Sequence, residues 1–269
     1  MKLNLKIALL PISLTLFAIP EIGLTNFPVI SIIGQTLKFN SKASAQLVTD
    51  YAAPSDTKRK SRTQGAGSRG CDAFSTRGFD DGSHSDHRAA NPELQLLAPN
   101  DHIPTTVSTH PTFYWYISAT SLPVRFTLVE PGVIKPVADR RFRVTRPGVV
   151  GVKLPSDVPG LVVGKQYRWT VAIVCDEERP SANTYAYGWI SRVVATPELK
   201  SKLAKVSNNS QNRSLVYAQS GIWYDALSSS IMDYEANHQD EVFSRLLTQA
   251  EIPGLNNQKL QQGNIVRSY

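Results

Sequence analysis

One alternating stretch, residues 161–175, constrains the fold of this chain more than any other. From residue 167 its large apolar side chains recur at every second position, while Arg168 and Thr170 stand between them. Successive side chains of a strand point to opposite faces of a sheet. The apolar set therefore predicts a central strand with one aromatic, buried face, formed by Tyr167, Trp169, Val171, Ile173 and Cys175.

The residues that open this strand resemble a corner of immunoglobulin-like sandwiches. Leu161, Gly164 and Tyr167 are spaced three apart. In such corners the Tyr ring lies in the core and its hydroxyl hydrogen-bonds back to the upstream backbone. We expect Tyr167 to make this contact.

Other short segments with strand patterns flank the central strand, each bounded by Pro, Gly, Asn or Asp. They are residues 94–98, 111–117, 124–129, 142–144, 149–154 and 185–194. Strand signals that recur about every 8–12 residues are typical of antiparallel sandwiches. We therefore expect a mainly β protein with an immunoglobulin-like antiparallel β-sandwich over residues 91–195.

Four tyrosines of these segments fall opposite the expected core: Tyr114, Tyr116, Tyr185 and Tyr187. Together they would form a carbohydrate- or protein-binding face. The alternative, which we favour, is that they pack beneath loops or against the neighbouring unit.

The hydrophobic period changes at Thr196, where Thr196, Pro197 and Glu198 form a helix start: an N-cap hydroxyl, a proline in the first turn and an acid near the positive helix end. Apolar residues then recur at helical spacing, and a last helix is expected over residues 239–250. We expect a helical unit over residues 196–252 and a disordered tail over residues 253–269.

The segment 217–227 is the most distinctive in the chain. Its spacing of Tyr217, Gly221, Trp223, Tyr224 and Asp225 resembles part of one tetratricopeptide-like helical hairpin, although a solenoid would need about three or more copies. These five residues form either a partner-binding surface or the joint between the helical unit and the sandwich. A buried Trp223 would favour the joint, and an exposed one a binding site.

Several short motifs, taken in order, resemble the cyanobacterial Domain of Unknown Function 928 family. The resemblance runs from about residue 65 to residue 247, and Phe243 stands where the family pattern suggests Trp. It implies a cyanobacterial exported protein and supplies no activity and no catalytic residues. Its motifs are residues 67–71, 111–115, 167–169, 175–176, 188–190 and 217–227.

The N-terminus predicts export. Lys2 and Lys6 precede an apolar run over residues 7–19, and Ala43-Ser44-Ala45 is a small-residue cleavage pattern, so residues 1–45 are expected to be a signal peptide. A retained membrane anchor is the alternative, but Pro and Glu residues interrupt the run before it reaches the roughly 20 apolar residues of a spanning helix. The mature chain would contact the membrane only during export, and its place would be the periplasm, the cell envelope or outside the cell.

The chain has two cysteines, Cys71 and Cys175. Because an exported chain meets an oxidising compartment, we expect them to form a disulfide, with two buried thiols as the alternative. The bridge would connect the N-terminal arm to the central strand.

Residues 46–90 are expected to be a linker or N-terminal arm, and two patterns within them are discounted as sites. Residues 65–70 have the glycine spacing of a dinucleotide fingerprint, but no strand precedes and no helix follows. His84, Asp86 and His87 have metal-ligand chemistry, but no third nitrogen or sulfur ligand stands nearby. We therefore expect no cofactor, no metal and no catalytic constellation.

Two classes of function remain for this chain, a binding module and a hydrolase. Removal of residues 1–45 takes away four lysines and one glutamate, which lowers the net charge from +7 to +4, too mild to indicate nucleic-acid binding. We expect a non-catalytic binding module with an envelope protein or glycan as partner, in an oligomeric state that the sequence leaves open. The alternative is an envelope hydrolase that uses Asp225 or the acids Asp176, Glu177 and Glu178.

Overall fold

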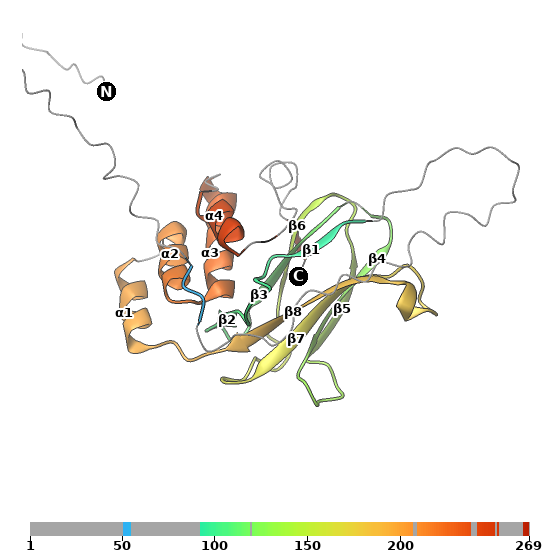
Figure 1. The fold of residues 1–269 in the computed structure, drawn as a ribbon, viewed down its shortest axis with the longest axis horizontal. Helices are drawn as coiled ribbons and strands as arrows, with labels where there is room; N and C mark the ends of the chain where they lie inside the picture. Colours follow the sequence, from blue (N-terminus) through green and yellow to red (C-terminus); the bar gives the residue numbers. More distant parts are fainter. Residues whose placement is uncertain are drawn as a thin grey trace, which may run out of the picture. The chain divides into compact units, whose positions relative to one another are not determined.

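Nine strands and four α-helices form the described part of the chain (Figure 1). The computed structural model describes residues 51–54, 92–118, 120–206, 209–237, 241–250, 252 and 266–268. The strands are β1 (Leu94–Leu96), β2 (Thr105–Thr106), β3 (Thr112–Ile117), β4 (Pro123–Val129), β5 (Ala138–Arg143), β6 (Gly148–Lys153), β7 (Gln166–Ile173), β8 (Thr184–Arg192) and β9 (Val266–Ser268). The helices are the 3₁₀ turn η3 (Pro180–Ala182), α1 (Pro197–Lys205), α2 (Ser210–Gln219), α3 (Trp223–Asn237) and α4 (Glu241–Gln249).

The strands form two sheets. One has the order β1-β3-β6, with the short β9 added beside β6, and the other has the order β2-β8-β7-β4-β5. Every pair within β1-β3-β6 and β8-β7-β4-β5 is antiparallel, as expected from the short strand spacing. The expectation fails for β2 with β8 and for β6 with β9, which are parallel. Neither pair is consecutive in the chain, so no tight hairpin imposes the antiparallel direction on it.

The two sheets pack on each other through aromatic rings. Phe113 of β3 lies 5.1 Å from Phe126 of β4 and 5.3 Å from Trp169 of β7, measured between ring centroids. Trp115 is fully buried and its ring is stacked on Phe126. The alternation of β7 is confirmed, because Tyr167, Trp169, Val171 and Ile173 are all buried while Arg168 is exposed.

Tyr167 forms the expected corner. Its ring is buried, and its hydroxyl accepts a hydrogen bond from the Val162 backbone N–H at 3.0 Å. Gly164 stands between them with φ 78°, a left-handed conformation that glycine adopts without strain. The corner therefore fixes how the chain enters β7.

The helices begin and end largely where local chemistry predicts. The Thr196 hydroxyl caps α1 by accepting from the Leu199 N–H at 3.2 Å. In the sequence, apolar residues recur at helical spacing from Leu215 to Tyr234, but the structure divides this stretch into α2 and α3. Gly221, with φ 72°, ends α2, and the N–H groups of Gly221 and Ile222 bond back to the carbonyls of Ala218 and Tyr217. This is the Schellman arrangement.

The structure also tests the expected exposure of the tyrosines and the expected disorder of the C-terminal tail. Of the four tyrosines considered together above, Tyr114 and Tyr116 are buried, whereas Tyr185 is exposed and Tyr187 is partly exposed. The Tyr114 ring lies against Gly151 of the neighbouring strand β6. Within the tail expected to be disordered, residues 266–268 form β9. No helix of the described part of the chain is both long and apolar enough to cross a membrane.

Candidate functional site

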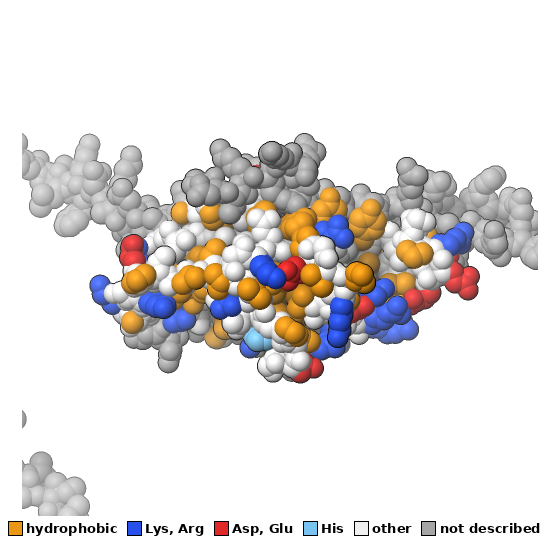
Figure 2. All heavy atoms as spheres, turned by 90° about the horizontal axis from the view of Figure 1, so that it is seen from below, with side chains coloured by type: hydrophobic (Ala, Val, Ile, Leu, Met, Phe, Trp, Pro, Cys, Tyr) orange, Lys and Arg blue, Asp and Glu red, His pale blue; other side chains and the backbone are white. Residues whose placement is uncertain are grey.

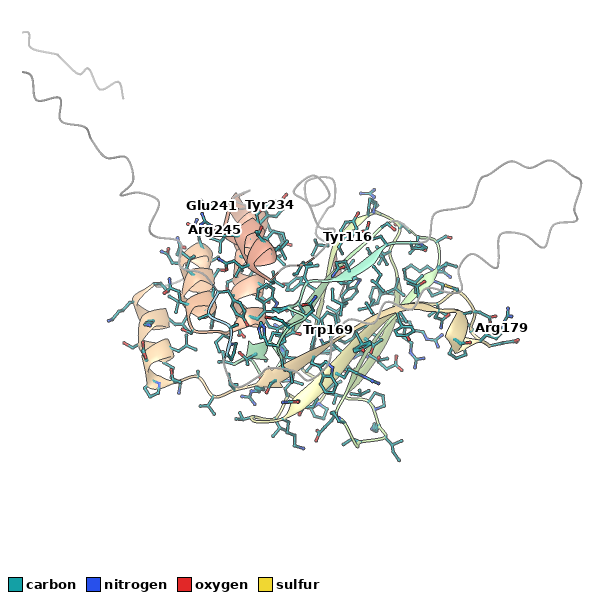
Figure 3. All side chains as sticks on the ribbon, in the orientation of Figure 1. Tyr116, Trp169, Arg179, Tyr234, Glu241 and Arg245 are labelled. Atoms are coloured by element: carbon teal, nitrogen blue, oxygen red, sulfur yellow. The ribbon has the colours of Figure 1, made fainter. Side chains whose placement is uncertain are left out.

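Trp223 and Tyr224, at the start of α3, connect the helices to the sheets. Trp223 is 0% exposed, and its indole N–H donates to the Leu97 carbonyl at 3.1 Å. The Tyr224 hydroxyl donates to the Trp189 carbonyl at 2.7 Å and accepts from the Trp169 indole N–H at 2.9 Å. Figure 3 places Trp169 in the interior, between the helices and the outer strands. The start of α3 therefore inserts into the core shared by both sheets.

The short strand β2 also contacts the start of α3 and the turn before it. The Thr105 hydroxyl donates to the Gly221 carbonyl at 2.8 Å, and the Thr106 hydroxyl donates to the Asp225 carboxylate at 2.7 Å. The same carboxylate oxygen accepts from the Val107 N–H at 3.1 Å. Burial raises the pKa of the Asp225 carboxyl, and these hydrogen bonds oppose the rise. The carboxylate thus joins α3 to β2.

A segment near the N-terminus lies across this corner. The Ala52 N–H donates to the Ala218 carbonyl at 3.1 Å, and the Tyr51 N–H donates to the Gln249 side chain at 2.7 Å. The Tyr51 ring stacks on His102 and meets Trp223 edge-on, while its hydroxyl is 2.7 Å from His102 Nε2. We call residues 51–54 the N-terminal strap, since they contact α2, α4 and the loop after β1 together.

These contacts favour one of the two alternatives for the five residues singled out in the sequence: they form the joint between helices and sheets rather than a partner-binding surface. Tyr217, Gly221, Trp223 and Tyr224 are buried, and Asp225 is partly buried. Sequence reasoning missed the residues that face them, which are Tyr51, His102, Thr105 and Thr106. In the sequence, only the adjacent threonines after Pro104 stand out locally. The hydrophobic period of an element cannot reveal hydrogen-bond partners that lie more than 100 residues away in the chain.

A cleft of about 280 Å³ lies beside the joint. Its walls come from the start of β3, the end of β6, and helices α2 and α3. Lys153 and Arg213 line it together with Asp225 and several hydroxyl side chains. The Arg213 guanidinium lies over the Tyr217 ring, 5.7 Å from its centroid, and donates to the Tyr217 hydroxyl at 3.2 Å.

The outer face of the five-stranded sheet carries a second set of polar and aromatic side chains. Tyr185, Tyr187 and Trp189 alternate along β8 with the buried or inward Ala186, Gly188 and Ile190. The strand register places Ala172, Thr170 and Arg168 of β7 opposite these three aromatics. We call Tyr185, Tyr187 and Trp189 the aromatic row. Tyr185 is 40% exposed, and the other two are partly exposed.

Gly188 shows why the aromatic row can form on this strand. A Cβ at residue 188 would lie 3.0 Å from the Trp169 indole nitrogen and 3.2 Å from a Leu96 methyl group. The glycine therefore lets β8 approach the buried Trp169 closely on its inner face. Its neighbours Tyr187 and Trp189 then point to the outer face.

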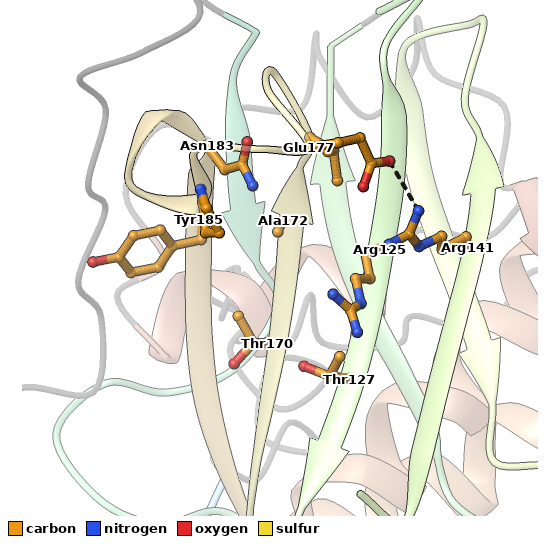
Figure 4. A pocket seen from close by; sticks show the side chains of 10 residues that line it. Arg125, Thr127, Arg141, Thr170, Ala172, Glu177, Asn183 and Tyr185 are labelled. Atoms are coloured by element: carbon orange, nitrogen blue, oxygen red, sulfur yellow. Dashed lines mark hydrogen bonds and ion pairs between the residues drawn. The ribbon is translucent and has the colours of Figure 1, made fainter.

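Arginine side chains lie on the strands to one side of the aromatic row. Arg141 pairs with Glu177 across the outer face (Figure 4). Arg125 pairs with Asp139, and Arg168 lies 5.9 Å from the Tyr187 ring centroid. The hydrogen bond from Arg125 lowers the pKa of the Asp139 carboxyl. Figure 2 shows a face on which the charged side chains are mostly Lys and Arg, with hydrophobic side chains between them.

Two hollows lie at opposite ends of the aromatic row. One, of about 260 Å³, is lined by Tyr185, Thr170, Thr127 and Arg125 among others, which Figure 4 draws on neighbouring strands. The other, of about 350 Å³, is lined by Trp189, Arg168 and the turn after β4. The outer face is therefore a strip with a recess at each end.

The acids that follow β7 are engaged in a turn. Asp176 pairs with Arg179 and accepts from the N–H of Glu178 at 2.8 Å, and the Arg179 hydrogen bond lowers the pKa of the Asp176 carboxyl. Figure 3 places Arg179 at the end of the sheets away from the helices, so this turn does not approach Asp225. The described residues contain no group of three side chains suited to hold a metal ion.

Several expected features concern residues that the structure does not describe. Cys175 lies partly buried just after β7, but Cys71 lies outside the described residues, so the disulfide stays a prediction. The glycines of residues 65–70, the set His84, Asp86 and His87, and the signal peptide also lie outside them.

Comparison with known proteins places the chain in a family. A search of curated proteins finds no match. The family model described as Domain of Unknown Function (DUF928) matches residues 64–260, which include both sheets' main strands and all four α-helices. Since this match covers well over half of the chain, the protein belongs to the DUF928 family.

Proposed function

We propose that the protein is an exported, non-catalytic binding module that holds an acidic polysaccharide of the cell envelope on the outer face of its five-stranded sheet. The observation that carries the proposal is the aromatic row of β8 flanked by arginines. Aromatic rings offer a broad apolar surface with a negative face, on which the C–H groups of sugar rings pack.

The geometry of the row suits an extended ligand. Alternate residues of a strand lie about 6.8 Å apart, so Tyr185, Tyr187 and Trp189 present rings at regular intervals. A recess at each end extends the surface beyond the row. A long, repeating chain uses such a regular strip better than a compact ligand does.

The charge of the face favours an acidic chain. Glu130, which lines one recess, pairs with Lys165. Four arginines point to the face, Arg125, Arg141, Arg143 and Arg168, against the acids Asp139 and Glu177. Both acids already pair with arginines, and Arg168 forms no ion pair among the described residues. The excess positive charge complements carboxylates on the ligand.

The hydrolase alternative draws less support. A paired-carboxylate mechanism needs two acids about 5–10 Å apart across a cleft. Asp225 is the one acid among the described residues that line the joint cleft, and its Oδ2 oxygen is occupied by Thr106 and Val107. The acids 176–178 belong to a separate turn.

The immunoglobulin-like architecture belongs to the same proposal. The sheets β1-β3-β6 and β5-β4-β7-β8 follow the pairing that immunoglobulin-type sandwiches use, and the Tyr167 corner agrees with it. The consecutive helices α2 and α3 contact each other and are joined by a short turn at Gly221, which supports one tetratricopeptide-like hairpin. Export, the Cys71–Cys175 disulfide and a cyanobacterial source remain proposals that rest on the sequence and the family resemblance.

A binding measurement tests the function. The mature chain, from residue 46, is expected to bind polygalacturonate and not the neutral polysaccharide dextran, with affinity that falls as salt rises. Tyr185→Ala and Tyr187→Ala should each weaken binding about 2- to 10-fold, since aromatic packing contributes about 0.5–1.5 kcal/mol. Val194→Ala, an exposed apolar truncation in the connection to α1, is the control and should leave affinity unchanged.

Three outcomes would refute the proposal. One is equal binding of dextran and polygalacturonate. Another is binding of polygalacturonate that survives both tyrosine substitutions at wild-type affinity. A third refuting outcome is that neither polygalacturonate nor dextran binds.

A further inference from the structure

The cleft beside the joint is separate from the aromatic row and has its own chemistry. It lies between the sheets and the helices, whereas the row lies on the outer face of the five-stranded sheet. We propose that this joint cleft binds a small hydroxylated carboxylate, of the sugar-acid class. The proposal goes beyond the function proposed above and does not depend on it.

The first argument is unbalanced positive charge. Lys153 ends β6 and Arg213 lies on α2, so two chain segments bring cations to the same cleft. Neither forms an ion pair within the described part of the chain. Asp225 is the one acid among the described residues that line the cleft, and its Oδ2 oxygen accepts from Thr106 and Val107. It interacts with Arg213 only through space, so two cations face one carboxylate. A ligand carboxylate would supply the missing negative charge.

The second argument is the rest of the lining. Thr112, Ser228 and Ser229 present hydroxyl groups to the cleft, and each hydroxyl can both donate and accept. Pro111 and Met232 add an apolar edge, and Met232 is 49% exposed. A molecule with several hydroxyls, a carboxylate and a C–H face matches these three kinds of group.

The third argument is size. Ligand pockets usually have volumes of about 300–1,000 Å³. The joint cleft, at about 280 Å³, lies just below this range, which fits a single sugar-sized unit rather than a polymer. Because its walls come from both the sheets and the helices, a bound ligand would bridge the two and stabilise the folded state by mass action.

Isothermal titration of the mature chain with three probes tests this ligand class. D-glucuronate should bind at one site, whereas D-glucose, which lacks the carboxylate, and propionate, which lacks the hydroxyls, should each bind at least about tenfold more weakly. Equal affinity for glucuronate and either of the other probes would overturn the proposal, and so would the absence of saturable glucuronate binding.

A matched pair of lysine variants locates the site. Lys153→Gln should weaken glucuronate binding about 10- to 150-fold, because a hydrogen bond to a charged group contributes about 1.5–3 kcal/mol. Lys200→Gln, at an exposed lysine of α1 outside the cleft, should change nothing. Both residues are exposed, so neither variant should unfold the chain, and equal affinities in the two would refute the assignment.

The two proposed sites are distinguished by exchanging the probes. The double variant Tyr185→Ala, Tyr187→Ala should retain glucuronate binding, and Lys153→Gln should retain polygalacturonate binding. Loss of glucuronate binding in the tyrosine variant would place that ligand on the outer face and overturn the joint cleft as its site. If the tyrosine variant loses polygalacturonate binding but keeps glucuronate binding, the result supports the two sites as separate.

Discussion

Tyr167 shows how one side chain positions a central strand. Its ring is buried in the core and its hydroxyl holds the backbone of Val162. The contact closes the turn that leads into β7, with Gly164 at its tip. Ring and hydroxyl therefore have separable roles, because the first fills the core and the second fixes the turn.

The substitution Tyr167→Phe separates these roles. It keeps the ring and removes the acceptor of the Val162 N–H, so the free energy of unfolding should fall by about 1 kcal/mol. Urea denaturation of both proteins measures the difference. An unchanged midpoint would mean that water replaces the hydroxyl without cost.

Asp225 predicts a pH effect at the residue scale. Because burial raises its pKa in the folded state, the folded protein binds this proton more tightly than the unfolded chain does. Its stabilising contribution is therefore present below the ordinary carboxyl pKa and is lost as the pH rises through the raised value. Asn at this position does not titrate and can still accept from Thr106 and Val107.

The variant Asp225→Asn should thus gain stability relative to the wild type as the pH rises from the ordinary carboxyl pKa towards neutrality. Urea unfolding at several pH values measures the difference between the two proteins, which removes the contributions of other carboxyls. A difference that stays constant with pH would show that the pKa of Asp225 is not raised.

At the scale of elements, the α2–α3 corner depends on one glycine for two reasons. Gly221 has a left-handed φ of 72°, and a Cβ there would lie 2.6 Å from the Ala52 carbonyl oxygen of the N-terminal strap. Gly164 has a similar φ of 78°, but nothing lies within 4 Å of its Cβ position. At the Cβ position, the two glycines therefore differ by the contact with the strap.

This pair gives a controlled prediction. Gly164→Ala should cost about 1–2 kcal/mol for the backbone conformation alone. Gly221→Ala should cost more, because the strap must also move. Urea unfolding compares the two variants, and equal losses would contradict the close approach of the strap.

Deletion of residues 46–54 from the mature chain isolates the contact with the strap. In that background the loss caused by Gly221→Ala should fall to the value of Gly164→Ala. The coupling between the deletion and the substitution measures the contact, as in a double-mutant cycle. Additive effects would show that the strap does not lie against Gly221.

At the scale of the molecule, sheets and helices share one core. The Tyr224 hydroxyl bonds to Trp169 and Trp189, and the Trp223 indole bonds to the carbonyl after β1. We expect a single unfolding transition, in which near-ultraviolet signals from the buried tryptophans coincide with the helical signal. Two separate transitions would mean that the helices unfold alone.

The variant Tyr224→Phe tests this coupling. It removes the Tyr224 hydroxyl that accepts from the buried Trp169 indole N–H, so the free energy of unfolding should fall by about 2–4 kcal/mol. The near-ultraviolet and helical transitions should still coincide. Calorimetry and circular dichroism measure both quantities. Loss of the helical signal alone would show that sheets and helices are joined more weakly than these contacts indicate.

Local patterns predicted much of the fold because their causes lie within a few residues. Alternation in β7, the Tyr167 corner and the α1 start at Thr196 each depend on neighbours in sequence. The break at Gly221 was missed, since an apolar stripe continues through it and a lone glycine does not by itself end a helix pattern.

By itself, the sequence determined the main strands of the two sheets, the helical part after Thr196 and the buried face of the central strand, and it singled out residues 217–225. Only the tertiary structure decided that Trp223 is buried, that β2 and the N-terminal strap hold the joint, and that the aromatic row and the joint cleft are separate surfaces. The physical reason is distance along the chain. Periodicity reports which side of an element is apolar, whereas contacts such as Thr106 to Asp225, 119 residues apart, arise only when the sheets and helices pack together.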